Sequence, residues 1–521
     1  MTLEEQAATL DRDSIVALLR SQQHLSTENE RLRFQLAWLR RQLYGRKSER
    51  RLIEAIGKQL TLGEYLQEDP AELEESVVVP EHRRRKKRRP GEELDVEKLR
   101  FDESVPVEEI RLPNPEVDEA DDTQEITEKV TYRLAQRPAS YVILKYIRPV
   151  VKKQDGALSC PAAPPAVLGS KSIADVSLLA GLAIEKFRFH LPLYRQHQRM
   201  EAAGIRLARS TLTNWIHRAA DLLQPVYAAQ FISILNSDVL TMDETPIKAG
   251  RKGHGKMQTG YFWPVYGDQH EIVFPFAPSR SGDMVRKILG EYCGVLVSDG
   301  YQVYESHAKQ INGLVHAQCW SHTRREFIKA EEAEVRHAGK ALDLIRDLYA
   351  KEARLKKRHL PAEKILEQRS IHSKPIVDRL FAWLKETLTK EALLPSNLFT
   401  KAANYALDRE DSLRVFLEYP NVPMDTNHLE REIRPIAVGR KNWLFCWTEV
   451  GADCVGIFQS LLSTCRLQGI DPHTYLVDVL QRIDSHLASE VQLLTPRLWK
   501  ENYAENPLVS DLDRESQNAV R

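Results

Sequence analysis

Two short segments that each carry an aspartate after an apolar run decide the fold: residues 239–243, with the sequence VLTMD, and residues 295–300, with the sequence VLVSDG. The apolar run in each segment predicts a buried β-strand, and the glycine after the second aspartate predicts a turn. Functional sites of α/β sheets are built where strands end. We therefore expect the carboxylates of Asp243 and Asp299 to converge at one edge of a sheet.

The sequence around these two segments predicts the remainder of a mixed sheet. Apolar runs at 261–266 and 271–276 predict two short strands, the spacing at 284–292 predicts a helix, and 314–319 predicts a further strand. Three antiparallel strands, a helix and then another strand form the order of a ribonuclease-H-like sheet. Other mixed α/β sheets share this pattern, so the pattern alone leaves them open.

Two converging carboxylates repel each other unless a cation holds both ionised or one of them takes up a proton. Mg²⁺ suits a site made of oxygen ligands and keeps water molecules for the reacting groups. Two such ions ~4 Å apart would stabilise the attacking and the leaving oxygen of an in-line phosphoryl displacement. That chemistry normally needs a third acid. Taken alone, each aspartate is more simply a turn or cap residue.

A candidate for the third acid lies far along the chain, in residues 423–435. The pattern predicts a helix that begins with Asp425 or Thr426 as its cap and carries Glu430. Two arginines lie on neighbouring faces of this helix: Arg431 and Arg434. A carboxylate beside arginines fits a metal ligand next to phosphate-binding groups. A surface helix with ordinary salt bridges would show the same charges.

The segment after this helix carries a second group of candidates for DNA contact. The helix is expected to break at Pro435, because proline disrupts a helix interior. Two cations and an aromatic ring then suit contact with a nucleic-acid backbone and stacking on bases. These residues are Arg440, Lys441 and Trp443.

The N-terminal region has a heptad pattern. Leucine recurs every seven residues, at Leu18, Leu25, Leu32 and Leu39. If the leucines occupy d positions, Asn29 is a buried polar residue at an a position, which favours a two-stranded coil. Residues 1–50 are therefore predicted to form a coiled coil that pairs two copies of the chain. An amphipathic helix packed on its own chain is the alternative.

A block of seven consecutive cations precedes an acidic stretch that begins at residue 91. The cations are Arg83, Arg84, Arg85, Lys86, Lys87, Arg88 and Arg89. Such a block binds nucleic acid by neutralising phosphates and releasing counterions. A solvated linker whose basic and acidic halves attract each other accounts for the composition equally well.

The region between the acidic stretch and the first aspartate predicts strands and then helices. Residues 130–151 are rich in Val, Ile and Tyr and predict one or two strands, and 161–165 predicts a linker. Apolar residues at spacings of three and four then predict helices over about 173–234.

Part of this helical stretch resembles a helix-turn-helix unit. Its two helices would cover 193–203 and 210–216, with the turn at Gly204 and a cap at Ser210. The candidate DNA contacts of this unit are Ser210, Thr211 and Asn214. An ordinary helical hairpin is the alternative.

Length and composition bound the class of protein. The chain has 521 residues, which at roughly 150 residues per domain suggests three or four domains. Its 74 basic residues balance 74 acidic ones, which excludes a uniformly basic nucleic-acid coat but not local patches. No apolar run approaches the ~20 residues of a membrane helix, and six cysteines without a C-x-x-C pair argue against a disulfide framework. We expect a multi-domain cytoplasmic protein with no membrane partner.

Together these segments resemble the transposases of the insertion sequence 66 family, which belong to the DDE, or ribonuclease-H-like, transposases. The resemblance covers nearly the whole chain, and its motifs occur in the same order. They are YGRKSER (44–50), HLPLYRQ (190–196), STLTNW (210–215), MDETP (242–246), SDGY (298–301), CWSHTRREF (319–327), NHLEREIRP (427–435) and GRKNWLF (439–445). Any one motif alone is weak, whereas the ordered set is strong.

The resemblance implies that Asp243, Asp299 and Glu430 are the catalytic and metal-binding triad. It implies Mg²⁺ as the cofactor, as two ions, for which Mn²⁺ can substitute. It also implies DNA as the partner, namely the terminal repeats of a mobile element and a target. Accessory proteins of the same element are further expected partners.

Two further implications concern cysteine and histidine. Cys319 and His322 match a C-x-x-H that many such transposases carry after the second aspartate, and we expect them to have a structural role near the acids. Zinc is not expected there, because ligands at intervals of three, with His316, converge poorly. Nor is a zinc finger expected after the coil, because residues 90–160 contain only Cys160, whereas the family often has paired cysteines. The family's two asparagines before the glutamate are here Thr426 and Asn427.

The predicted fold is a multi-domain α/β protein with an N-terminal coiled coil, a helical DNA-binding region and a ribonuclease-H-like core interrupted by a helical insertion. The expected order is the coil (1–50), a charged linker at the family's zinc-finger position (51–129), a β segment and linker (130–165), the helical region (166–235), the first part of the core (236–329), the insertion (330–417), the second part of the core (418–470) and a tail (471–521).

The predicted function is transposition of DNA in the bacterial cytoplasm, in association with the nucleoid. The protein would cut a strand at the element end and join the freed 3′-hydroxyl to target DNA. One alternative is a catalytically inactive or repurposed DNA-binding or assembly protein derived from such a transposase. Another is a ribonuclease-H-like nuclease that cuts without joining.

Overall fold

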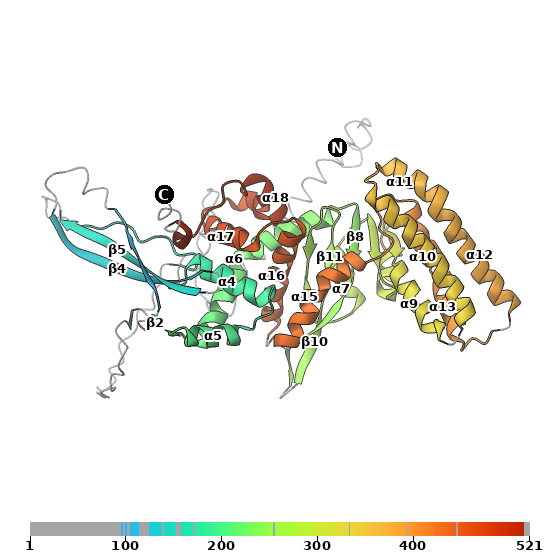
Figure 1. The fold of residues 1–521 in the computed structure, drawn as a ribbon, viewed down its shortest axis with the longest axis horizontal. Helices are drawn as coiled ribbons and strands as arrows, with labels where there is room; N and C mark the ends of the chain where they lie inside the picture. The colour runs from blue at the N-terminus through green and yellow to red at the C-terminus, as the bar shows by residue number, and fades with distance from the viewer. Residues whose placement is uncertain are drawn as a thin grey trace, which may run out of the picture. The chain divides into compact units, whose positions relative to one another are not determined.

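The computed structural model is a mixed α/β protein with several sheets and many helices (Figure 1). It describes residues 95–96, 99–101, 105–113, 124–137, 140–152, 158–169, 172–253, 256–332, 334–391, 393–443, 446 and 448–514. The predicted coil and the basic run at 83–89 lie outside these residues. The chain divides into two units, 1–67 with 485–488, and 68–484 with 489–521. In the described parts of the chain, no helix is both long and apolar enough to cross a bilayer.

A five-stranded sheet forms the centre of the larger unit. Its strands lie in the order β12, β11, β8, β14 and β15, with the bounds Ile272–Val273, Val265–Tyr266, Val239–Met242, Val295–Ser298 and Val315–Gln318. Strands β8, β14 and β15 are parallel to one another, whereas β11 is antiparallel to both β8 and β12. The two aspartate-bearing segments of the sequence are therefore adjacent parallel strands.

Both faces of this sheet are covered by helices. Successive side chains of a strand point to opposite sides, so each strand contributes to an apolar cluster on either face. Leu240 and Leu296 pack in a cluster with α7 (Gly282–Leu289), α8 (Gln302–Ala308) and the end of α6 (Arg209–Leu235). Val239, Val295 and Val297 pack in a second cluster, on the helices that follow β15. Strands covered on both sides explain the continuous apolar runs of the sequence.

The helices after β15 form a bundle with its own apolar core. They are α9 (Trp320–Glu331), α10 (Val335–Lys357), α11 (Ala362–Gln368), α12 (Lys374–Lys390), α13 (Leu398–Leu407) and α14 (Glu410–Arg414). Figure 1 shows α9, α10, α12 and α13 side by side, and their apolar faces share one cluster. The buried Trp320 links the first helix of the bundle to the last, since its Nε1 donates to the carbonyl of Leu413 in α14 at 2.8 Å. The stretch expected to be a helical insertion is thus helical.

A second sheet pattern, which the sequence did not predict, follows Asp243 directly. Strands β9 (Thr245–Gly253) and β10 (Lys256–Phe262) form a hairpin, and β10 also pairs with β13 (Phe276–Ala277). The single strand predicted at 261–266 is in fact divided between β10 and β11. Pro264 lies at this division, and proline cannot donate to a strand ladder.

The region before the central sheet contains the strands and helices that the sequence predicted. β4 (Gln124–Arg137) and β5 (Ser140–Lys152) are two long antiparallel strands, and β3 (Val107–Arg111) and β6 (Leu158–Ser159) flank β5. Helix α4 (Val176–Phe187) follows, capped by the side chain of Asp175. Residues 130–151 therefore contribute to two strands.

Helices α5 (Leu193–Ala202) and α6 form the pair that resembled a helix-turn-helix unit. Gly204 lies in their connection with a φ of 83°, a conformation that favours glycine. The connection also contains β7 (Ile205–Arg206), which pairs with β2 (Leu99–Phe101), itself paired with β1 (Asp95–Val96). The predicted cap at Ser210 is wrong, because α6 begins at Arg209 and Ala208 occupies the N-cap position.

The C-terminal part is helical. Its helices are α15 (Asn427–Trp443), α16 (Glu449–Leu467), α17 (Pro472–Arg482) and α18 (Pro496–Asn502). The predicted break at Pro435 is wrong, because α15 continues through it to Trp443 and loses at that position only the one backbone donor that proline lacks. The stretch expected to be a tail is folded: the fully buried Asp478 accepts hydrogen bonds from Arg482, Trp499 Nε1 and Leu508 N.

Candidate active site

The ends of β8 and β14 bring two aspartates together. Asp243 directly follows β8, Asp299 directly follows β14, and the two strands pair in parallel with Val297 opposite Thr241. Carboxylate oxygens of Asp243, Glu244 and Asp299 all lie within 4.8 Å of one another. This acid cluster, as we call the three residues, lies where the strand pattern of the sequence placed two acids.

Backbone hydrogen bonds fix the orientation of both aspartates. The N–H of Glu244 donates to Asp243 Oδ1 at 2.7 Å, and the N–H of Tyr301 donates to Asp299 Oδ1 at 2.9 Å. Each aspartate thus turns one oxygen toward a backbone N–H of its own segment.

Glu244 is a member of the cluster that the sequence interpretation missed. Its Oε2 accepts from the Tyr304 hydroxyl at 2.7 Å and its Oε1 from Arg280 Nε at 2.7 Å, and the Glu244 side chain is only 3% exposed. The guanidinium of Arg280 also lies 4.1 Å from the ring centre of Tyr301. The signal for Glu244 was its position beside Asp243 in the MDETP motif. Tyr304 and Arg280 come from separate elements, so no local pattern pointed to them.

The cluster is electrostatically crowded. Burial, and then the charges of Asp299 and Glu244, raise the pKa of Asp243 to about 7. Burial also raises the pKa of Glu244, although hydrogen bonds from Tyr304 and Arg280 oppose that shift. Acids that are this hard to ionise together are stabilised by a cation. A set of carboxylate oxygens is the ligand type that Mg²⁺ and Mn²⁺ prefer. The residues present therefore fit a divalent cation.

Glu430 approaches the cluster from a different direction. It lies in the first turn of α15, and its charge contributes to the raised pKa of Asp243. It is not among the three acids whose oxygens lie within 4.8 Å of one another. Instead, both of its carboxylate oxygens accept from Arg325 Nη2, at 2.6 and 2.8 Å. The third expected acid therefore lies at the edge of the cluster, and Arg325 is another residue that the sequence interpretation missed.

The C-x-x-H residues are engaged with protein groups near the acids. Cys319 is buried, and its Sγ accepts from both the N–H and the hydroxyl of Thr426 at 3.3 Å. His322 Nε2 lies 2.9 Å from Arg325 Nη1, and His316 Nε2 lies 2.8 Å from Ser298 Oγ. Among the residues that the structure describes, the acid cluster is the one group of three or more such side chains that could hold a metal.

The predicted DNA contacts of α15 differ in their exposure. Arg431, Arg434 and Lys441 are exposed, whereas Arg440 donates to the Pro246 carbonyl at 2.6 Å. Trp443 is partly buried and packs close to Gly439 of its own helix, where a Cβ would come within 2.2 Å of the indole ring. A cleft of about 640 Å³ adjoins this helix, with Arg431 and Lys356 among its lining residues.

The other predicted contacts lie on a separate element. Ser210 and Asn214 are exposed and Thr211 is partly buried, all in the first two turns of α6. Beside them, the guanidinium of Arg209 lies 4.6 Å from the ring centre of Tyr194 on α5. The basic run at 83–89 lies outside the described residues.

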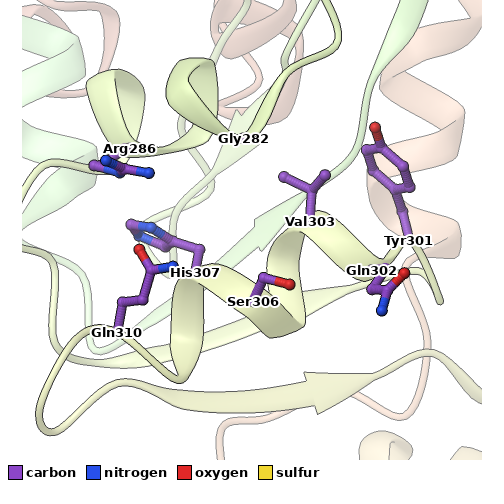
Figure 2. A pocket seen from close by; sticks show the side chains of 8 residues that line it. All are labelled: Gly282, Arg286, Tyr301, Gln302, Val303, Ser306, His307 and Gln310. Atoms are coloured by element: carbon purple, nitrogen blue, oxygen red, sulfur yellow. The ribbon is translucent and has the colours of Figure 1, made fainter.

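A small hollow lies between α7 and α8 and is lined by Tyr301, whose N–H donates to Asp299 (Figure 2). It has a volume of about 320 Å³. Its lining residues are Gly282, Arg286, Tyr301, Gln302, Val303, Ser306, His307 and Gln310. Figure 2 shows Arg286, His307 and Gln310 grouped at one end and Tyr301 at the other. The lining contains a cation and several amide and hydroxyl groups but no carboxylate.

These features define the class: an α/β protein with a cluster of acids at strand ends that could hold a cation. The family model "Transposase IS66 family" matches residues 171–454, and the chain belongs to that family. Two further family models also match, "IS66 C-terminal element" at residues 460–496 and "Transposase C of IS166 homeodomain" at residues 31–110. The resemblance stated from the motifs is thereby confirmed, and the family implies a transposase that uses divalent metal and binds DNA.

Curated relatives are similar to this chain over about two thirds or more of its length. The uncharacterized protein y4hP of Sinorhizobium fredii (strain NBRC 101917 / NGR234) is 29% identical over 397 residues, which cover 72% of this chain and 71% of that protein. The uncharacterized protein y4jD of the same strain is 29% identical over 365 residues, or 67% of this chain and 70% of that protein. Both matches extend over most of each chain.

Proposed function

We propose that this protein catalyses DNA transposition with a ribonuclease-H-like core. One observation carries the proposal: carboxylate oxygens of Asp243 and Asp299 lie within 4.8 Å of each other at the ends of two adjacent parallel strands. The sheet order supports such a core, since β12, β11 and β8 are joined antiparallel, and β14 and β15 follow parallel to β8. The helices of 330–417 are then the insertion between β15 and the helix of Glu430.

In this proposal Asp243, Asp299 and Glu430 bind two Mg²⁺ ions, which Mn²⁺ can replace. When bound, the ions would act as Lewis acids that stabilise the attacking and the leaving oxygen of the phosphoryl transfer. The sheet keeps Asp243 and Asp299 in place, because backbone N–H groups hold one oxygen of each carboxylate. Glu430 comes from a distant part of the sequence, in the first turn of α15, and its carboxylate is held by Arg325.

Exposed cations of α15 would bind the DNA backbone beside the acids. Arg431, Arg434 and Lys441 are exposed and can neutralise phosphates. Arg440 is tied to the Pro246 carbonyl and would support the start of β9 as well as contact DNA. The partly buried Trp443 is a weaker candidate for stacking on bases than the sequence suggested.

DNA ends would be bound and paired by the remaining parts. The exposed first turns of α6 and the basic run Arg83 to Arg89 would bind the terminal repeats, and the N-terminal coil would join two copies of the chain. Accessory proteins of the same element would assist. The product of the first step is a free 3′-hydroxyl, which attacks target DNA in the second step, so no serine or tyrosine nucleophile is required. The protein would act in the bacterial cytoplasm, at the nucleoid.

A strand-transfer assay tests the proposal. The full chain would be incubated with labelled DNA from the ends that flank its gene, with Mg²⁺ or Mn²⁺, beside Asp243→Asn, Asp299→Asn and Glu430→Gln. Matched controls are Asp343→Asn, whose side chain is 62% exposed on α10, and Glu363→Gln, which is exposed on α11. We expect cleaved and joined products from the wild type and both controls, and none from the three site variants.

The other outcomes each have a clear meaning. Nicked products without joining would favour the nuclease. Equal products from the wild type and Asp243→Asn would reject this active site. DNA binding without chemistry in either metal, with the coil and α6 intact, would favour a repurposed DNA-binding protein.

A further inference from the structure

Three side chains at intervals of three residues connect α9 to the first turn of α15. They are Cys319, His322 and Arg325. Cys319 occupies the N-cap position of α9, and residues three apart on a helix lie on the same side. Cys319 contacts Thr426, Arg325 contacts Glu430, and His322 contacts Arg325.

Cys319 fixes the start of that segment. Its Sγ accepts two hydrogen bonds from Thr426, one from the N–H and one from the hydroxyl, and both residues are at most 2% exposed. The next residue reinforces the contact, because the Trp320 N–H donates to the Met424 carbonyl at 3.0 Å. The carbonyl of Thr426 then accepts from the N–H of Glu430 at 3.0 Å. The first turn of α15 is thus held in place against the end of β15.

Arg325 fixes the side chain of Glu430. One guanidinium nitrogen, Nη2, donates to both carboxylate oxygens, and the other, Nη1, donates to His322 Nε2 at 2.9 Å. His322 accepts at Nε2, so it holds the guanidinium in one orientation without adding a positive charge there. Arg325 and Glu430 lie 105 residues apart in the chain, and their side chains are 45% and 32% exposed.

We propose that Arg325, oriented by His322, is a positioning residue of the active site that holds Glu430 ready at the edge of the acid cluster. This inference rests on the proposed function. A cation that recruits Glu430 has to compete with Arg325 for the same two oxygens. Because the ion pair is partly exposed, it is weak enough to be exchanged. Once released, the guanidinium stands beside the acids with free N–H donors for a phosphate oxygen.

The C-x-x-H residues gain a physical role from this arrangement. Cys319 positions the backbone of α15, and His322 positions the side chain of Arg325. Both residues thus act on Glu430 through protein contacts: Cys319 through Thr426, and His322 through Arg325.

Two measurements on the full chain test the proposal. The first is direct binding of Mn²⁺ without DNA, followed by electron paramagnetic resonance. Arg325→Gln removes a cation that touches a metal ligand, so Mn²⁺ should bind about three- to tenfold more tightly. Arg325→Lys keeps the charge and should stay within about twofold of the wild type. Arg324→Gln, the exposed neighbour on α9, is the matched control and should leave binding unchanged.

The second measurement is single-turnover DNA cleavage at saturating Mn²⁺. Arg325→Gln should cleave at least about tenfold more slowly than wild type, because Glu430 is no longer oriented. Tighter metal binding with slower chemistry is a split that a merely structural role does not produce. His322→Leu, which keeps Arg325 but removes its acceptor, should show the same split to a smaller extent.

The outcomes that overturn the proposal differ from those that overturn the proposed function. Arg325→Gln that folds as wild type by circular dichroism but binds Mn²⁺ equally or more weakly, or cleaves at the wild-type rate, contradicts the role of Arg325. If Arg325→Gln fails to fold, His322→Leu decides in the same way. A wild type that binds no Mn²⁺, or binds it as Asp243→Asn does, rejects the metal site itself.

Discussion

The acids of this protein are positioned in two different ways. Asp243 and Asp299 follow adjacent parallel strands, so their separation is set by the register of β8 and β14. Glu430 stands on a helix whose start is held by Cys319 and whose carboxylate is held by Arg325. One part of the site is therefore determined by the backbone of a buried sheet. The other depends on side-chain contacts between segments distant in sequence.

The two parts also differ in their electrostatics. At the strand ends, burial and then the charges of neighbouring carboxylates raise the pKa of Asp243 to about 7. The helix presents a carboxylate whose charge is already compensated by a guanidinium. We therefore expect the strand-end acids to destabilise the protein without metal and to dominate its affinity for metal, while the α15 contacts stabilise the fold.

The largest expected difference concerns metal affinity. Asp243→Asn or Asp299→Asn should weaken Mn²⁺ binding by about a hundredfold or more, because each removes a charged ligand that the sheet holds in place. Glu430→Gln should weaken it by only about fivefold, because that carboxylate is shared with Arg325. Electron paramagnetic resonance of Mn²⁺ measures all three. A Glu430→Gln effect as large as that of Asp243→Asn would erase the distinction between the two parts.

The next effect is the dependence of stability on pH. Asp243 keeps its proton in the folded chain up to about pH 7, whereas the unfolded chain loses it near its ordinary value of 3.8. The folded state thus binds more protons between these values, and stability falls as pH rises through this window. Without metal, the free energy of unfolding should fall by about 2.5 kcal/mol between pH 5 and pH 8.

Urea denaturation in the presence of a chelator measures this change, with Asp243→Asn as the reference. The variant should be more stable than wild type at pH 8, and its stability should vary less with pH. Parallel pH profiles for the two proteins would show that the cluster is not strained in the folded state.

A smaller effect is expected from the fourth carboxylate, Glu244. Glu244→Gln keeps an acceptor for Tyr304 but removes a charge from the cluster, so DNA cleavage should slow by about tenfold. The matched control is Glu305→Gln, whose side chain is 42% exposed and paired with Lys309. Cleavage rates at saturating Mn²⁺ compare the two. Loss of all activity in Glu244→Gln would instead make Glu244, rather than Glu430, the third acid of the site.

The last effect concerns stability alone and tests the support of α15. Cys319→Ala leaves two buried donors of Thr426 without their acceptor, which should cost about 1–2 kcal/mol of unfolding free energy. Cys319→Ser retains an acceptor and should cost less. Denaturant titration of both variants provides the values. Equal stability of Cys319→Ala and wild type would remove Cys319 from the account of how α15 is held.

The same division explains what the sequence could predict. Strands β8 and β14 and the acids after them were predicted for two reasons. A buried strand has a local apolar pattern, and functional sites of α/β sheets lie where strands end. The helices after β15 and Glu430 in a helical first turn were also accessible, from periodicity and from the motif of the family. Each of these signals lies within a few consecutive residues.

The rest depended on contacts that no local pattern records. Arg325 meets Glu430 across 105 residues, and Tyr304 meets Glu244 across 60. The hairpin of β9 and β10 was missed because residues 248–253, with the sequence KAGRKG, contain no large apolar residue. The break expected at Pro435 is absent because the surrounding packing outweighs the one backbone hydrogen bond that is lost.

The most direct test of the account is the location of Mn²⁺ in crystals of the protein, from anomalous diffraction. We predict an anomalous peak between the carboxylates of Asp243 and Asp299, and its loss in crystals of Asp243→Asn. A peak at Cys319 and His322 instead, or no peak between the two aspartates at saturating Mn²⁺, would contradict the claim that adjacent strand ends form the metal site.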